Sequence, residues 1–190
     1  MAYIIEVLRQ EYCNIESLLR VLERELSVFD LGDRPDYEVV RAVIDYFKDY
    51  PDSCHHPKED MIVEKLKARD PVAAAAIGDL KAQHREGARR LRQVANAVEY
   101  VLGDQDLVRQ TVGEIIRDFI NHERQHMAME EHVVFPAALD GLQPEDWAEI
   151  ALKLADRSDP FYQPGFEERL NTLRRSILEM ENEAEAERTY

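Results

Sequence analysis

Residues 126–134 read HMAMEEHVV, and residues 55–63 read HHPKEDMIV. Both stretches fit the pattern H-x-x-x-E-[DE]-x-[IV]-V, so one short motif occurs twice in the chain. In a helix, a histidine and a glutamate four residues apart lie one turn from each other, about 6 Å along the axis. Each copy therefore predicts a helix with an imidazole and a carboxylate on one face, where both can reach one metal ion or an adjacent pair.

The spacing of two further residues extends the repeat to helical hairpins. His84 precedes His126 by 42 residues, and Tyr12 precedes His55 by 43 residues. Tyr12 is therefore the counterpart of His84, and both are expected to face inward beside the two motifs.

Apolar residues at alternating steps of three and four predict four long helices. Pro51 and Pro57 fall inside the second one and predict a bend, because each proline removes a backbone hydrogen bond. The fourth is expected to end at Pro136, with Val133 on its inner face. Short connections favour an all-α, up-down-up-down four-helix bundle. The predicted helices cover about residues 5–26, 36–66, 71–103 and 106–135.

The rest of the chain predicts additional C-terminal helices. We expect a bundle domain over residues 1–140 and a helical extension over 141–190, with a short helix after Pro144. A last helix shows a narrow apolar stripe, which predicts a partner that is either the bundle or a second subunit, and we expect a homodimer. The alternating acids of residues 179–187 predict a frayed, solvated end. The stripe consists of Phe166, Leu170, Leu173, Ile177 and Met180.

Composition limits the partners and the compartment. Among 190 residues, 39 are acidic and 24 are basic, which gives a net charge of −15. A field of that sign repels nucleic acids and anionic membrane surfaces, so neither is expected as a partner. The start of the chain does not resemble a secretion signal, and its two cysteines are too few for a disulfide scaffold. The sequence therefore predicts a cytoplasmic protein with reduced thiols.

Several ionisable side chains that face inward in one layer need compensation, since burying an isolated charge costs several kcal/mol. A metal ion provides that compensation. Imidazoles and carboxylates without a cysteine, inside a four-helix bundle, are typical of paired iron. Glu59 and Glu130 are the expected bridging carboxylates between two ions.

The repeated motif resembles the hemerythrin-like, or HHE cation-binding, family of non-haem di-iron bundles. The resemblance spans about residues 4–136 and implies two iron ions bridged by carboxylates and an oxo group. This chain departs from the family at Tyr12, which stands where the family has a histidine. Tyr12 either binds as a phenolate, or packs as a core aromatic hydrogen-bonded to a carboxylate, or leaves a position to water, an external ligand or a nearby histidine. The implied ligands are His55, Glu59, His84, His126 and Glu130.

Three more histidines have weaker assignments. His122 shares the inner face one turn before His126 and is expected to line the cavity or support a ligand, or else to replace the missing first-helix histidine. His56 is expected to support a ligand, or else to replace His55 as one, although the repeat favours His55, because Met127 follows His126. His132 is expected at the surface.

The resemblance implies a protein that binds or processes a small oxidant such as dioxygen, peroxide or nitric oxide. A phenolate from Tyr12 stabilises ferric iron, which favours peroxide turnover or a response to oxidative stress over reversible dioxygen carriage. The alternative is a non-catalytic metal-binding protein, either a sensor or a store of labile iron. The sequence leaves open whether the chain is an enzyme.

Overall fold

The structure is a computed structural model that describes residues 3–103, 108–155 and 165–188. Every regular element among these residues is helical, which confirms the prediction of an all-α fold. The segments are α1 (Tyr3–Asp30), α2 (Tyr37–Tyr50), η1 (Pro51–His55), α3 (His56–Arg69), α4 (Pro71–Ile77), α5 (Leu80–Leu102), α6 (Arg109–Met129), η2 (Glu130–Val134), α7 (Phe135–Gly141), α8 (Pro144–Leu154) and α9 (Phe166–Arg188).

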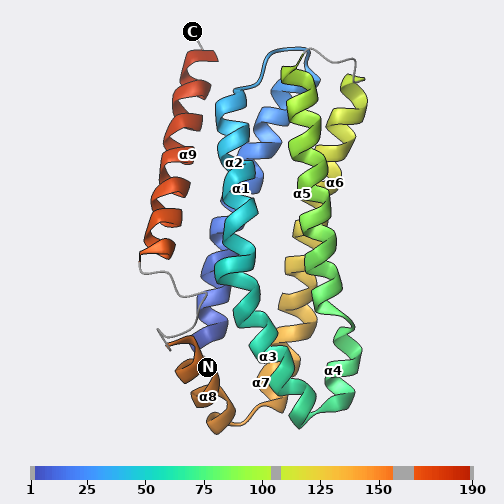
Figure 1. Cartoon of the computed structure of the whole chain (residues 1–190), viewed down its shortest axis with the longest axis vertical. Helices are drawn as coiled ribbons and strands as arrows, with labels where there is room; N and C mark the ends of the chain where they lie inside the picture. The colour runs from blue at the N-terminus through green and yellow to red at the C-terminus, as the bar shows by residue number, and fades with distance from the viewer. Residues whose placement is uncertain (1–2, 104–107, 156–164, 189–190) are drawn as a thin grey trace.

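Four helical columns run side by side along the long axis of the molecule (Figure 1). They are formed by α1, by α2 continued as α3, by α5, and by α6 continued as α7. Within this group α1 contacts α2, α2 contacts α5, α5 contacts α6, and α6 contacts α1, so each column has two neighbours. The residues between the columns therefore face a shared interior.

Two of the columns contain a π-helical turn: η1 ends at His55, the first residue of one copy of the repeated motif, and η2 covers the last five residues of the other copy. The turn η1 lies where the bend was predicted, with Pro51 in its first turn and Pro57 in the first turn of α3. The expected end at Pro136 is wrong, because η2 restarts the helix and Pro136 then lies in the first turn of α7, where a missing N–H costs little. The π turn also shifts the inner face, so that Val133 is 37% exposed and Val134 is buried instead.

The predicted helix over 71–103 is two helices. Gly78 adopts φ = 77°, a left-handed conformation that favours glycine, and this breaks the helix after Ile77. Asp70 caps α4 by accepting hydrogen bonds from the N–H groups of Val72 and Ala73. Asp79 caps α5 in the same way through Ala82. The sequence pattern missed the break because the apolar stripe continues across it.

The apolar core forms two clusters at different heights of the bundle. One lies among α1, α2, α5, α6 and α9, and the other among the start of α1, α3, α4, α7 and α8. Tyr12 packs against both clusters. The interior between the clusters is polar, and the repeated motif lies there.

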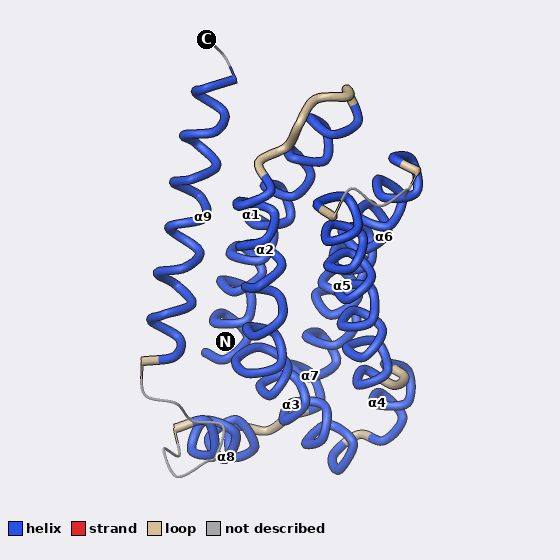
Figure 2. The backbone as a smooth tube through the Cα atoms, turned by 45° about the horizontal axis from the view of Figure 1, so that its top comes forward, coloured by secondary structure: helices blue, strands red, loops and turns tan. Residues whose placement is uncertain are grey.

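The last helix packs on its own bundle. Figure 2 shows α9 alongside α1 and α2, which it contacts, while α8 crosses the lower end. Leu170 and Ile177 are buried, and Leu173 and Met180 pack against the same core cluster. The side chain of Phe166 lies outside the described part. The stripe is thus occupied within one chain, and the homodimer stays a prediction.

The acidic end is helical rather than frayed, whereas the expectation that it is solvated is confirmed for four of its five acids, Glu179, Glu183, Glu185 and Glu187, which are exposed. Helix α9 continues to Arg188, and two ion pairs fasten it to α1. Glu181 is 1% exposed and pairs with Arg24, while Arg188 pairs with the buried carboxylate of Glu25 at 2.6 Å. The alternating acids therefore include one that anchors the helix.

We expect Arg24→Ala to lower the free energy of unfolding by roughly 1–3 kcal/mol, because it leaves the buried carboxylate of Glu181 without its partner. Arg20→Ala is the matched control, since Arg20 lies one turn earlier with a side chain that is 66% exposed. Urea denaturation of both variants measures the difference. Equal losses would show that the pair with α9 contributes nothing specific.

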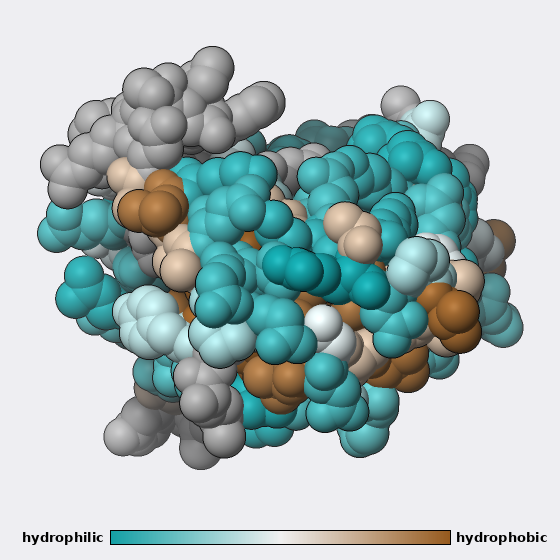
Figure 3. All heavy atoms as spheres, turned by 90° about the horizontal axis from the view of Figure 1, so that it is seen from below, coloured by the Kyte–Doolittle hydropathy of each residue, from teal (hydrophilic) through white to brown (hydrophobic). Residues whose placement is uncertain are grey.

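The lower end of the molecule offers little contiguous apolar surface. Figure 3 shows this end covered mainly by hydrophilic residues, with hydrophobic residues in small patches. Exposed Val72, Leu139 and Leu152 belong to α4, α7 and α8. Scattered residues of this kind are ordinary on protein surfaces. None of the helices in the described ranges combines the length and the apolar character needed to cross a membrane.

Candidate metal centre

A layer of ionisable side chains separates the two apolar clusters. The six predicted ligand positions come from all four columns: Tyr12 from α1, His55 and Glu59 from η1 and α3, His84 from α5, and His126 and Glu130 from α6 and η2. Tyr12 is partly buried, and Glu59 and Glu130 are fully buried. The repeat therefore brings together residues that lie far apart along the chain.

The side chains form two overlapping donor sets. One set consists of His56, Glu59, His84 and His126, and the other of His55, Glu59 and Glu130. Within each set, one ligand atom from every residue lies within 4.8 Å of the others. Glu59 belongs to both sets, as expected of a carboxylate that bridges two ions. One set is rich in nitrogen donors, and the other is rich in oxygen donors.

Unpaired buried atoms show that these sets suit a cation. Within the described residues, no hydrogen bond reaches either carboxylate oxygen of Glu59, Oε1 of Glu130, Nε2 of His84 or Nε2 of His126. Buried polar atoms without partners are costly, and a metal ion would satisfy all five together.

The distances between donors agree with this assignment. His55 Nε2 lies 2.7 Å from Glu59 Oε1, His84 Nε2 lies 3.3 Å from Glu59 Oε2, and His126 Nε2 lies 3.5 Å from Glu130 Oε1. Ligands about 2.1 Å from one ion and at right angles to each other are about 3 Å apart. The donor atoms thus have the mutual spacing of neighbouring ligands.

The donors of this layer differ widely in how strongly they bind protons when no metal is present. Burial lowers the pKa of His55 and His84, but the neighbouring carboxylates outweigh it and raise the pKa of His55 to about 10 and that of His84 to about 9. Burial raises the pKa of Glu130 to about 7, with the charge of Glu59 acting in the same direction. Burial lowers the pKa of His126 to about 3, so its ring keeps a free lone pair at neutral pH.

The side chains of Glu11 and Gln83 contact Nδ1 of His55 and of His126 and so fix the orientation of these two rings. Nδ1 of His55 lies 2.8 Å from Glu11 Oε2, and Lys58 Nζ donates to Glu11 Oε1 at 2.7 Å. Nδ1 of His126 lies 3.2 Å from Oε1 of Gln83. Such contacts leave Nε2 of each ring free for a metal. Sequence reasoning missed Glu11, although it falls three residues after Leu8 on the apolar stripe of α1.

Tyr12 takes part in the layer through its hydroxyl, which donates to Glu130 Oε2 at 2.6 Å. Its ring stacks on Phe135 and meets the ring of His55 edge-on at 5.3 Å. Burial and the charges of Glu130 and Glu59 raise the pKa of Tyr12, so the hydroxyl keeps its proton when no metal is bound. This is the hydrogen-bonded arrangement, one of the expectations for this position.

The remaining three histidines lie in three different surroundings. His56 stacks on His84 with ring centroids 3.6 Å apart and joins the nitrogen-rich set, beyond the supporting role expected for it. His122 is partly buried, lines a cavity beside the donors and stacks parallel to His126 at 6.4 Å. His132 is exposed, as predicted.

Glu123 is a residue that sequence reasoning missed. It lines the same cavity as His122, and burial raises its pKa to about 7. The sequence contains an indication of this role, because Phe119, Glu123 and His126 are spaced by four and three residues, which places them on the same inner stripe of α6.

The chain also matches a family model, described as the hemerythrin HHE cation binding domain, over residues 3–138. This range contains all six predicted ligand positions and both π turns, and it ends within α7. No significant match was found among curated proteins or among solved structures. Because the family model covers well over half of the chain, this protein belongs to the hemerythrin HHE cation-binding domain family.

Proposed function

We propose that the chain is a non-haem di-iron protein of hemerythrin type that decomposes hydrogen peroxide. The observation that carries the proposal is the pair of donor sets that share Glu59 inside the bundle. The ring of contacts among α1, α2, α5 and α6 supports an up-down-up-down four-helix arrangement around them. Imidazole and carboxylate donors without a cysteine favour iron over calcium or magnesium.

Each residue has a role in holding this centre. His56, His84 and His126 would bind one ion, His55 and Glu130 would bind the other, and Glu59 would bridge them. Iron, when bound, supplies the reversible electron transfer that peroxide chemistry needs. The two apolar clusters cover the layer from above and below along the bundle. Glu11 and Gln83 hold two of the rings in the orientation that binding requires.

An oxygen electrode tests this function. The iron-loaded chain is expected to evolve one dioxygen for every two molecules of peroxide consumed, whereas the metal-free chain and free iron at the same concentration are expected to do much less. Iron analysis of the same sample establishes that two ions are present. Peroxide consumption without oxygen evolution, ending after a few equivalents, would instead support the non-catalytic sensor or iron store.

Tyr12→Phe tests the role of the residue that departs from the family motif. We expect a visible charge-transfer band in the ferric protein, because a nearby metal ion lowers the pKa of a coordinating group and so allows the phenolate to bind. The hydroxyl of Tyr12 lies 2.6 Å from Oε2 of Glu130, a member of one donor set, and is therefore close to the expected iron position. The variant is expected to retain iron and lose the band, as recorded by absorption spectroscopy. An unchanged spectrum would restrict Tyr12 to hydrogen bonding with Glu130.

A further inference from the structure

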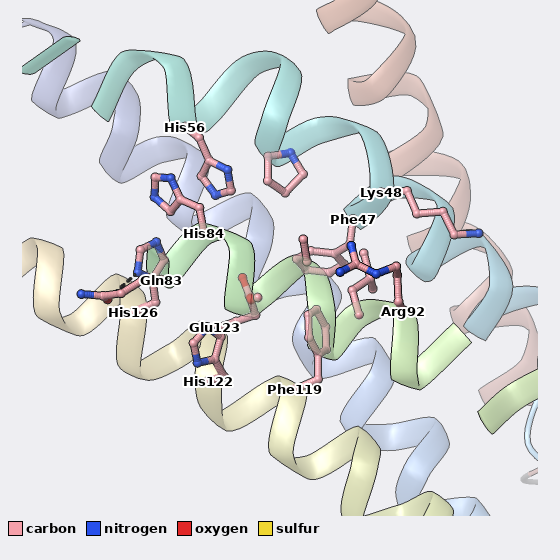
Figure 4. Close-up of a pocket in the computed structure, with 14 residues that line it drawn as sticks. Phe47, Lys48, His56, Gln83, His84, Arg92, Phe119, His122, Glu123 and His126 are labelled. Carbon is pink, nitrogen blue, oxygen red and sulfur yellow. Dashed lines mark hydrogen bonds between the residues drawn. The ribbon is translucent and has the colours of Figure 1, made fainter. Parts of the chain in front are cut away.

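A cavity of about 260 Å³ leads to the nitrogen-rich donor set. Figure 4 shows His56, His84 and His126 grouped at one end of it and Lys48 and Arg92 at the other. The latter two side chains are exposed, whereas His84 and His126 are buried, so the cavity runs from solvent to the metal ligands. Its volume is enough for a small molecule together with several waters, because one water occupies about 30 Å³ in the liquid.

Glu123 lies inside this cavity, between its two ends (Figure 4). Within the described residues its carboxyl group makes no hydrogen bond or ion pair, whereas the next residue, Arg124, binds both Glu16 and Glu23. Nε2 of His122, which lines the same cavity, is also buried without a hydrogen-bond partner. The carboxyl group of Glu123 and Nε2 of His122 thus lie beside the donor set without a hydrogen-bond partner among the described residues, and both can bond to a molecule that enters.

The helix opposite makes room for these groups. A Cβ atom at Gly87 of α5 would lie 2.8 Å from Oε1 of Glu123 and 3.5 Å from Nε2 of His122. The first distance is shorter than any ordinary carbon–oxygen contact. Gly87 is therefore what allows the carboxyl group of Glu123 to occupy the cavity.

We propose that this cavity binds hydrogen peroxide and that Glu123, assisted by His122, is the group that transfers protons to and from it. The inference rests on the proposed function. A neutral peroxide molecule has two O–H donors and two acceptor oxygens, so it can bond to both a carboxyl group and an imidazole. A small anion would meet repulsion from the carboxylate of Glu123.

The proton balance of peroxide decomposition requires such a group. One peroxide molecule loses two electrons and two protons and leaves as dioxygen. The other takes up two electrons and two protons, its O–O bond breaks, and it leaves as two water molecules. Iron, when bound, would supply the electron transfer between the two half-reactions. Glu123 takes one proton from the first molecule and His122 takes the other, and each returns its proton to an oxygen of the second molecule.

The test compares Glu123→Gln with Glu123→Asp in the iron-loaded chain. We expect Glu123→Gln to lower kcat for oxygen evolution by roughly 100-fold or more, the usual contribution of acid–base groups, with iron content unchanged. Glu123→Asp, which keeps the carboxyl group, should recover part of that loss. Azide binding, followed by absorption, should become roughly threefold to tenfold tighter in Glu123→Gln, because a negative charge near the bound anion is removed.

These opposite effects distinguish proton transfer from a structural role. A variant Glu123→Gln that loses turnover and also binds azide more weakly would indicate a damaged pocket and overturn the inference, as would wild-type values of both. Lack of oxygen evolution from the iron-loaded wild type contradicts the proposed function itself. The azide titration is read in every case, since it does not depend on turnover.

Gly87→Ala provides an independent test without changing either polar group. Its Cβ should displace the carboxyl group of Glu123 and lower oxygen evolution while two irons remain bound. Gly113→Ala in α6 is the matched control, because its Cβ would meet the flexible end of Arg117 at 2.9 Å, outside this cavity. Equal activity of the two variants would contradict the role given to Gly87 and Glu123.

Discussion

Glu59→Gln is expected to remove iron from both positions of the centre. Glu59 belongs to both donor sets, and its two oxygens face Nε2 of His55 and Nε2 of His84, which are donors of the same sets. Changing even groups that only support ligands typically lowers metal affinity about 10 to 100-fold, so loss of a shared ligand should exceed that range. Glutamine keeps the shape of the side chain while removing its charge. Iron content after gel filtration measures the effect.

Two comparisons make this result specific. Glu130 belongs to one of the two donor sets whereas Glu59 belongs to both, so we expect Glu130→Gln to retain more iron than Glu59→Gln. Glu64→Gln is the control for a charge change on the same helix, because Glu64 is exposed on α3. Equal iron content in Glu59→Gln and Glu64→Gln would refute the bridging role of Glu59.

Chelation of the iron is expected to lower the melting temperature by about 8–16 °C. Free metal at 1,000 times its Kd stabilises the folded state by about 4 kcal/mol, and each kcal/mol corresponds to about 2–4 °C for a chain of this length. The buried atoms that no described residue satisfies make this linkage strong. Differential scanning calorimetry of the loaded and chelated protein measures the shift.

The matched sample for that experiment is Glu59→Gln, which has little metal to lose. Its melting temperature should respond to the chelator by only a small fraction of the wild-type shift. A wild-type protein whose melting temperature does not change on chelation would contradict metal binding by the buried layer.

Spacing along the chain was sufficient to predict which side chains meet in the interior of the bundle. A histidine and a glutamate four residues apart share a helix face whatever the details of packing, and the repeat related the two faces to each other. His55, Glu59, His126 and Glu130 therefore meet in the interior as expected, together with His84. The stripe of α1 likewise placed Tyr12 beside them.

The apolar pattern predicts continuous α-helices and contains no signal for the two π turns. An α-helical pattern assigns consecutive residues to faces about 100° apart, so it could not place both His55 and His56 among the donors. The same reasoning put Val133 inside and missed Val134. Charged residues on an apolar stripe, such as Glu11 and Glu123, were the overlooked indication that more of the interior is polar.

The division of the apolar core into two clusters affects which amino-acid substitutions the chain can accept. Side chains of the two clusters are separated by the layer of ionisable residues, and Tyr12 is the large side chain that packs against both. Substitutions that share no partners usually have additive effects. We therefore expect each half of the core to accept repacking without compensating substitutions in the other half, whereas the ligand layer ties all four columns to one another at a single height.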